Sequence, residues 1–348
     1  VRIIGTCRNI KVKNCKFEYV PKSVRVYAKE PNDIIEKIEI TDNEVYHTDQ
    51  GGIEIKDGQN WGQTIPPFGR IKEVKILRNK FFSIGTRPIR GESPFTIDVH
   101  CGEIVEIAGN ILEKNYGGGI NVFAGKHHDL RDCPLIKIFI HHNKVKDCLL
   151  HTNDYGGIEI WQGGPAFVYN NIVINPLGPH HGDYLWTIET KREVNYTTGN
   201  FGFAYYADGQ YKGYFFNNIA IGKNNELGNA KCNACAYMEV GGFLHAYFNN
   251  FAYKFGAAFR KQPSLNGVQR AWYLGNYLCD ISDIYFDHYA WKASDVPDYY
   301  ETIGYVENTF TGRSRKFGVF DKEQKICLNL EEFSENLKKK NVLKYATG

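Results

Sequence analysis

Hydrophobic and polar positions along the chain return in one short module: an apolar run, one or two polar residues, an asparagine, and apolar residues again. Its ten copies contain the following asparagines: Asn14, Asn43, Asn79, Asn110, Asn143, Asn171, Asn218, Asn250, Asn276 and Asn308. The copies recur at intervals of 26 to 47 residues along nearly the whole chain. A repeat of this length is typical of a solenoid, in which each copy stacks on the next.

The asparagine has a physical role in such a stack. Equivalent residues of successive rungs lie about 4.8 Å apart in a coiled parallel sheet, so one amide can bond the turn backbone and the next amide. Asparagine also tolerates the left-handed backbone that a bend needs. Hairpin turns of an antiparallel sandwich are the alternative, but those favour Asn-Gly, whereas here an apolar strand residue follows the asparagine. The pattern predicts an all-β fold, a right-handed parallel β-helix of about ten rungs.

A second module consists of glycine-flanked strands upstream of the asparagines. Its copies are GGIEIKDG (51–58), FTIDVHCG (95–102), GGINVFAG (118–125) and GGIEIWQGG (156–164). The strand period of two turns the Ile and Val residues inward and the residues between them outward. The outward set is Glu54, Lys56, Asp98, His100, Asn121, Phe123, Glu159 and Trp161. Each rung then has about three strands, and the longer segments 59–70 and 176–200 are expected to be lateral loops that wall a groove.

The pattern changes near residue 321. The segment 329–341 has Leu330, Phe333 and Leu337 at helical spacing, which predicts a short amphipathic helix. We therefore divide the chain into a β-helix domain, residues 1–320, and a C-terminal helical cap or the start of a further segment, residues 321–348.

Composition narrows the range of partners. Forty-two Lys and Arg against 39 Asp and Glu give a net charge of +3, without the basic stripe of a nucleic-acid-binding protein. No apolar stretch reaches the roughly 18 residues of a membrane-spanning helix. The chain opens in mid-strand without Met or a leader, so we expect any targeting segment to be removed or to lie outside it. The oligomeric state has no signal in the sequence.

The nine cysteines lack the spacing of a disulfide framework. Cys232 and Cys235 form a single CxxC without a second pair, which argues against zinc. Free thiols are the prediction, because cysteine serves in buried positions as a small apolar residue.

Candidate catalytic groups are the outward carboxylates. Counting back twelve residues from Asn110 and Asn171 places Asp98 and Glu159 in register, two rungs apart. Two rungs separate the backbones by about 9–10 Å, and carboxyl groups ~6.5–9.5 Å apart suit an inverting glycosidase. Asn121 occupies the rung between them. Glu54 occupies the rung before Asp98, and that neighbouring pair would instead suit the retaining geometry of ~5 Å.

Glu159 lies in the densest unusual cluster of the chain, HTNDYGGIEIWQGGP (151–165). Polar and aromatic neighbours in that segment are His151, Asp154, Tyr155, Trp161 and Gln162. An outward Trp beside a carboxylate favours a sugar-binding surface, because sugar rings stack on aromatic faces. The alternatives are that Glu159 is an ordinary solvated strand residue and that a loop covers Trp161.

Further polar residues extend this candidate site. The segment 176–190 carries His180, His181, Asp183, Trp186 and Glu189. We predict substrate contacts for His181, Asp183 and Trp186, although the His-His-x-Asp string also resembles a metal site. Asp208 and Glu239 are expected to continue the acidic side, with a structural role as the alternative for Glu239. His100 can share a proton with Asp98 or be incidental.

At these residues the chain resembles the broad group of right-handed β-helix proteins that act on carbohydrates, which includes glycoside hydrolases, polysaccharide lyases and epimerases. The resemblance covers roughly residues 1–320 and is carried by the asparagine rungs and the Gly-Gly-Ile-Glu-Ile strands. The segments DYGGIEIWQGGPAFVYNNI and FFNNIAIGKNN are similar to bacterial β-helix proteins related to glycoside hydrolases. The paired Asp and Gly-His-Gly signature of polygalacturonases is absent. The resemblance favours an extracellular, periplasmic or cell-surface location.

Three functions remain open at this point. The first is a hydrolase of a poly- or oligosaccharide without a cofactor, with Glu159 and Asp98 as acid and base, Asp154 and Asp208 as further catalytic candidates, and no metal. The second is a polysaccharide lyase acting on a uronate-containing polymer, which needs a base, for which Lys56, His100, Arg87 and Arg90 are candidates, and often Ca²⁺. The third is a non-catalytic glycan-binding solenoid. The near-neutral charge and the acidic column argue against an anionic substrate.

Overall fold

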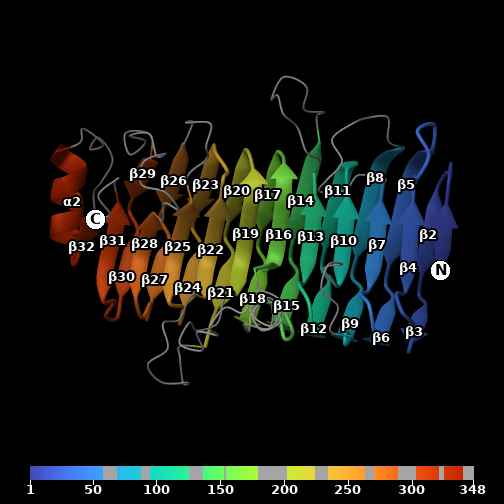
Figure 1. The fold of residues 1–348 in the computed structure, drawn as a ribbon, viewed down its shortest axis with the longest axis horizontal. Helices are drawn as coiled ribbons and strands as arrows, with labels where there is room; N and C mark the ends of the chain where they lie inside the picture. The colour runs from blue at the N-terminus through green and yellow to red at the C-terminus, as the bar shows by residue number, and fades with distance from the viewer. Residues whose placement is uncertain are drawn as a thin grey trace, which may run out of the picture.

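The fold is a coil with three strands in each turn. The computed structural model describes the following residues: 1–57, 69–87, 95–124, 136–152, 154–178, 202–223, 234–262, 270–288, 303–320 and 325–339. Strands of successive turns lie side by side along the long axis of the molecule, in colour order from the N-terminal to the C-terminal end (Figure 1). Every third strand therefore joins the same sheet, which gives three sheets in all.

Sheet 1 has twelve strands: β1 (Arg2–Ile4), β4 (Val24–Tyr27), β7 (Ile53–Lys56), β10 (Ile97–His100), β13 (Ile120–Phe123), β16 (Gly156–Gly163), β19 (Phe203–Gln210), β22 (Cys235–Val240), β25 (Ala257–Gln262), β28 (Ile284–His288), β31 (Lys316–Phe320) and β32 (Lys325–Cys327). Sheet 2 has ten: β2 (Ile10–Lys13), β5 (Ile34–Thr41), β8 (Arg70–Leu77), β11 (Gly102–Ala108), β14 (Lys137–His141), β17 (Ala166–Tyr169), β20 (Gly213–Phe216), β23 (His245–Phe248), β26 (Ala271–Leu274) and β29 (Ile303–Val306). Sheet 3 has ten: β3 (Lys16–Glu18), β6 (Glu44–Thr48), β9 (Lys80–Ile84), β12 (Ile111–Asn115), β15 (Lys144–Cys148), β18 (Ile172–Pro176), β21 (Ile219–Ile221), β24 (Phe251–Tyr253), β27 (Tyr277–Cys279) and β30 (Thr309–Thr311).

The strand pairing is parallel throughout these sheets, apart from the antiparallel contact of β31 with β32 at the C-terminal end. The order β2-β5-β8 and its continuation show that each strand pairs with its equivalents one turn earlier and one turn later. The ten strands of sheets 2 and 3 match the expected number of rungs. The prediction of a parallel coil is confirmed, and the antiparallel sandwich is excluded.

Buried asparagines form a continuous ladder along one corner of the coil. The Nδ2 of Asn143 donates to the Oδ1 of Asn171 at 3.0 Å and to the carbonyl of Ile107 at 2.8 Å. Its Oδ1 accepts the backbone N–H and the side-chain Nδ2 of Asn110. The same side-chain bond links each asparagine to the next from Asn43 to Asn308. Buried polar groups must be paired, so the ladder specifies how the rungs stack.

The ladder differs from the expectation in two details. Cys15, and not Asn14, occupies the first rung, because the N–H of Cys15 donates to the Oδ1 of Asn43. The left-handed bend also lies one residue before each ladder position, as at Asp42 and His142, whose φ angles are +58° and +55°. The ladder asparagines are therefore held in position by their amide hydrogen bonds, and the preceding residue makes the turn.

The inner faces of the three sheets are mainly apolar. Ile53, Ile97, Ile120 and Ile158 are at most 1% exposed and stack in register across β7, β10, β13 and β16. Later rungs use aromatic rings in the interior, as in the stacked column of Tyr205, Tyr237, Phe259 and Phe286. Burial of this apolar surface is the main source of stability, at about 25 cal/mol for each Å² removed from water.

A polar cluster interrupts this interior and corrects one expectation. Glu239 pairs in register with Ala207, on the inner face, so it does not continue the acidic side of the outer face. It is 1% exposed and forms an ion pair with Lys261, and the Nδ1 of His245 lies 3.0 Å from its Oε2. Burial lowers the pKa of Lys261 to about 7. Glu239 is therefore an interior structural residue, and the prediction that it contacts substrate is wrong.

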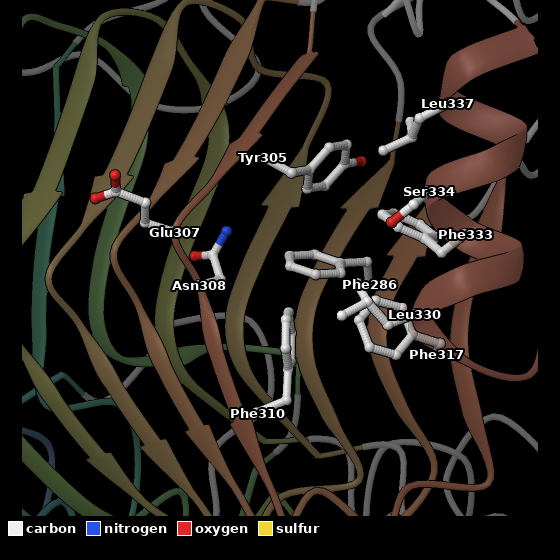
Figure 2. Close-up of a pocket in the computed structure, with 10 residues that line it drawn as sticks. All are labelled: Phe286, Tyr305, Glu307, Asn308, Phe310, Phe317, Leu330, Phe333, Ser334 and Leu337. Atoms are coloured by element: carbon white, nitrogen blue, oxygen red, sulfur yellow. The ribbon is translucent and has the colours of Figure 1, made fainter. Parts of the chain in front are cut away.

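Helix α2 (Leu330–Lys339) covers the C-terminal end of the coil (Figure 1). Figure 2 shows Phe333 and Leu337 pointing from the helix toward Phe286 and Tyr305 of the last rungs. The rings of Phe333 and Phe286 stack with centroids 5.7 Å apart, which extends the interior aromatic column into the helix. The predicted helix is confirmed, whereas the division into two domains stays a prediction.

Two predictions from composition can be compared with the described residues. Seven cysteines in them are free thiols, as expected, and Cys133 and Cys232 lie outside them. The same part of the chain has no helix of the length and apolarity needed to span a membrane.

Candidate functional site

Five neighbouring strands of sheet 1 follow one another in the order β7, β10, β13, β16 and β19 (Figure 1). Two rows of outward side chains cross them. Row 1 runs in register through Glu54, Asp98, Asn121, Glu159 and Tyr206. Row 2 lies two residues further along each strand. It includes the following residues in register: His100, Phe123, Trp161 and Asp208. The prediction that Asp98 and Glu159 are two rungs apart on one face, with Asn121 between them, is confirmed.

Residues of both rows, without Glu54 and Phe123, form the floor of a cavity of about 200 Å³. The cavity is lined by Lys56, Phe95, Asp98, His100, Asn121, Asp154, Tyr155, Glu159, Trp161, Tyr206 and Asp208. Asp98 and Glu159 are only 7% and 4% exposed, so the reading of Glu159 as a solvated surface residue is wrong. The residues come from five neighbouring strands, β7 to β19 of sheet 1, and the turns before β10 and β16, and stacking of the coil brings them together.

Asp98 lies among donors that stabilise its charge. Its Oδ1 is 3.1 Å from the Nε2 of His100 and accepts the Nδ2 of Asn121 at 2.8 Å, and its Oδ2 is 3.3 Å from the Nζ of Lys56. Burial opposes ionisation here, but the charges and hydrogen bonds of His100, Lys56 and Asn121 outweigh it and hold the pKa of Asp98 well below its usual range. Asp98 is therefore a carboxylate at all ordinary pH values.

Lys56 connects Asp98 to a second buried carboxylate, Glu54, at 2.9 Å. Glu54 also binds the Nζ of Lys22, the Nε of Arg25 and the hydroxyl of Tyr27. Although burial alone raises its pKa, the charge of Lys56 and the hydrogen bonds of Lys22 and Tyr27 lower it to about 2. Glu54 does not line the cavity, and its donors engage both carboxylate oxygens. The expected retaining pair of Glu54 with Asp98 is therefore not assembled, because Glu54 is part of the ion-pair network behind the site.

Glu159 has the opposite environment. Its Oε2 accepts the backbone N–H of Gly156 at 3.0 Å, and no ion pair with a described cation is found. Burial, followed by the charges of nearby Asp208, Asp154 and Asp98, raises the pKa of Glu159 well above its usual value. The protonated form of Glu159 is therefore favoured, whereas Asp98, two rungs away, is held in its ionised form.

Asp208 and Asp154 complete the acidic side of the cavity. Burial, with a contribution from Asp154, raises the pKa of Asp208 to about 7. Loss of hydration raises the pKa of Asp154 to about 6, but this residue, which also lines the cavity, is exposed. Of these three acids, Glu159 and Asp208 therefore keep a proton more readily than Asp154 does.

Aromatic rings flank this floor. Trp161 packs against Phe123 with ring centroids 4.7 Å apart, and Phe95 meets Tyr155 edge to face at 5.3 Å. Tyr206 lies beside Glu159 in register and is 5% exposed. Trp161 is half-buried, so part of its ring remains available to a ligand in the cavity. Rings around a polar floor suit a sugar, which has apolar faces and polar edges.

The predicted site residues have different outcomes. Those that meet at the cavity are Asp98, His100, Asn121, Asp154, Glu159, Trp161 and Asp208. Gln162 follows Trp161 at a left-handed bend with φ +56° and does not line the cavity. His181, Asp183 and Trp186 lie outside the described residues, as do the other members of 179–201. Among the described residues, no group of acids, His and Cys has the geometry of a metal site.

Sequence reasoning missed Tyr206 and Phe95 and considered Lys56 only as a lyase base. The signal for Tyr206 was present, because counting back twelve residues from Asn218 gives this position, as it gives Glu159 from Asn171. The same count from Asn250 gives Met238 as the outward residue, so it would have predicted that the next residue, Glu239, points inward. Phe95 precedes its strand and has no comparable pattern.

Comparison with protein families gives one match. A family model described as a right handed beta helix region matches residues 1–135. Comparisons with curated proteins and with solved structures gave no match. The matched segment and the three parallel sheets define the chain as a right-handed parallel β-helix repeat protein. Its outer-face cavity contains one carboxyl group, Asp98, whose pKa is lowered and another, Glu159, whose pKa is raised.

Proposed function

We propose that the protein hydrolyses glycosidic bonds, with Glu159 as the general acid and Asp98 as the general base. The observation that supports this most is that one cavity drives the pKa values of its carboxyl groups in opposite directions. Paired carboxyl groups with separated pKa values are the usual requirement for glycoside hydrolysis, because one must donate a proton while the other accepts one.

The register supports an inverting reaction. Row 1 places Asp98 and Glu159 two strands apart, which corresponds to about 10 Å between their backbones. This separation leaves room for a water molecule beside the sugar. Asp98 would take a proton from that water while the water oxygen forms a bond to the anomeric carbon. Glu159 would give its proton to the departing glycosidic oxygen, so the reaction consumes one water.

A lyase reaction has less support. The lyase base must be unprotonated, but Asp98 and Glu54 raise the pKa of Lys56, despite the opposing effect of burial, and keep it a cation. Arg87 does not line the cavity, and Arg90 lies outside the described residues. His100 is the remaining candidate, and it is in contact with Asp98.

The test is a panel of plant, algal and host glycans and 4-nitrophenyl glycosides, with the product anomer followed by NMR. We expect hydrolysis with inversion. The kcat of a Glu159→Gln variant should fall about 10²–10⁴-fold, while the variant still binds sugar. Glu106→Gln is the matched control, because Glu106 is a strand residue of sheet 2 with surface ion-pair partners. Unsaturated products that absorb in the ultraviolet would indicate a lyase. Binding without turnover in the unmutated protein would indicate a non-catalytic solenoid.

A further inference from the structure

Asn121 lies between the two proposed catalytic groups and has a hydrogen-bonding group without a partner. It pairs in register with Asp98 on one side and Glu159 on the other, and it lines the cavity. The residue is 2% exposed, and its Nδ2 donates to Asp98 Oδ1 at 2.8 Å. Its Oδ1 is buried and makes no hydrogen bond with any residue that the structure describes. A buried acceptor without a donor is rare in folded proteins and calls for an explanation.

The orientation of this amide follows from its neighbour. Asp98 is ionised and can only accept hydrogen bonds, so the NH₂ group of Asn121 must face it. The amide oxygen then faces away from Asp98. Since Asn121 lines the cavity, a molecule that occupies this space can supply the missing donor. The ion-pair network of Lys56 and Glu54 thus fixes Asp98, and Asp98 fixes Asn121.

The charges around Asn121 indicate which donor fits. Three of the carboxyl groups that line the cavity lie on its acidic side, at Asp154, Glu159 and Asp208. The ammonium group of Lys56, the lysine that lines the cavity, already contacts both Glu54 and Asp98. A carboxylate or sulfate on the reacting sugar cannot donate to Asn121 Oδ1, and the ionised Asp98 beside it would repel the negative charge. A hydroxyl group meets no such penalty and can donate to Asn121.

We infer that Asn121 Oδ1 accepts a hydrogen bond from a hydroxyl of an uncharged sugar, and that this contact selects neutral sugars over uronates. The inference rests on the proposed function, because it takes the occupant of the cavity to be a sugar. It assigns the substrate class and makes Asn121 the residue that determines it.

The test measures binding in the Glu159→Gln background, where cleavage does not interfere. The probes are methyl glycosides of glucose, galactose, mannose and xylose, the glucuronide and galacturonide, and the monodeoxy analogues of whichever neutral glycoside binds most tightly. Dissociation constants come from calorimetry. We expect one neutral glycoside to bind at least 10-fold more tightly than the uronides, and one monodeoxy analogue to bind about 10-fold more weakly than its parent.

Asn121→Ala should weaken binding of the parent glycoside about 10-fold and leave the affinity of that one deoxy analogue unchanged. Asn175→Ala is the matched control, since the Nδ2 of Asn175 also donates to a carboxylate, Asp147, on sheet 3. The inference would be overturned if the parent glycoside bound equally well to the Glu159→Gln protein with and without Asn121→Ala. Tighter binding of a uronide than of the neutral glycosides would overturn it as well. The deoxy series with Asn121 intact gives the same decision if the Ala variant does not fold. Failure of every glycoside to bind would remove the proposed function and the inference together, whereas failure of the Asn121 contrast alone removes only the inference.

Discussion

Replacing Lys56 by Met tests the charge arrangement on which the candidate site depends. The Nζ of Lys56 lies 3.3 Å from Asp98 Oδ2 and 2.9 Å from Glu54 Oε1, and its side chain is 26% exposed. Met keeps the length and apolar stem of Lys but removes the charge. Asp98 then retains His100 and Asn121 as donors and remains buried, so the opposing effect of burial on its pKa is no longer outweighed to the same extent.

The size of the effect follows from the distance. A cation within about 4–6 Å lowers the pKa of a carboxyl group by about 1–3 units, or about 1.4–4 kcal/mol between its two protonation states. We therefore expect the pKa of Asp98 to rise by about 1–3 units in Lys56→Met, toward its ordinary value of about 3.9. The rise would bring an acid limb into the measurable range of the kcat/KM profile, because the base would be protonated at low pH. Activity at neutral pH should change much less.

The direct measurement is the ¹³C NMR titration of the Asp carboxyl groups, with Asp98→Asn to assign the resonance. It needs no substrate. Lys22→Met is the matched control, because Lys22 is a nearly buried lysine that pairs with Glu54 at 2.8 Å. A pKa change of Asp98 below about half a unit in Lys56→Met, or an equal change in Lys22→Met, would refute the reasoning.

The effect of Lys56→Met on the free energy of unfolding should also depend on pH. The pKa of Asp98 is depressed in the folded state, so its ion pair stabilises the fold above the unfolded pKa and less as pH falls through the folded pKa. The destabilisation of Lys56→Met should therefore be largest near neutral pH. Urea unfolding at pH 7 and pH 3 compares the two conditions.

Three further predictions concern the acid cluster, the ladder and the interior. The kcat/KM of the proposed hydrolysis should fall as pH rises above about 7, because the acid cluster then loses its protons. Asp208→Asn should move this limb of the pH profile to lower pH, because it removes a charge that raises the pKa of Glu159. A shift to higher pH would contradict the assignment. Asn143→Ala should lower the free energy of unfolding by about 2–5 kcal/mol, because it leaves buried polar groups on two rungs without hydrogen-bond partners. The loss should be larger than for Asn308→Ala, at the end of the ladder. Urea titration followed by circular dichroism measures both. Lys261→Met should lower the free energy of unfolding by about 3–5 kcal/mol in the same assay, because Glu239 stays buried without its cation. Replacing both Lys261 and Glu239 by Met should lower it by less. Equal losses in the single and double variants would contradict this prediction.

Much of the fold was predictable because stacking imposes one requirement on every rung. The ladder position tolerates few side chains other than asparagine, so the asparagines mark successive rungs despite loops of different length. The register was misplaced by one residue at Asn14, where Cys15 lies in the ladder and only its backbone N–H is needed. A sequence pattern cannot distinguish these two neighbours, because the first rung has no preceding amide to bond.

The site was predictable where the count from the ladder holds. Asp98, Asn121 and Glu159 lie on short, glycine-flanked strands, so their parity and register could be read directly. Asp208 and Glu239 were grouped by acidity alone, and opposite strand parity separates them. The protonation states could not be read from the sequence, since they depend on partners from other rungs, such as Lys56 for Asp98.

The difference between Asp98 and Glu159 arises from a change of composition along the outer face of sheet 1. Cations accompany the acids on the early rungs, where Arg25 and Lys56 bind Glu54 and Asp98. Beyond Asn121 the rungs contribute acids and aromatic rings to the cavity without such cations. Burial is similar on both sides, so it acts in the same direction on each carboxyl group, and the presence of cations decides which one ionises. A solenoid can thus produce an acid and a base from equivalent positions of one repeat, with a neutral amide at the boundary.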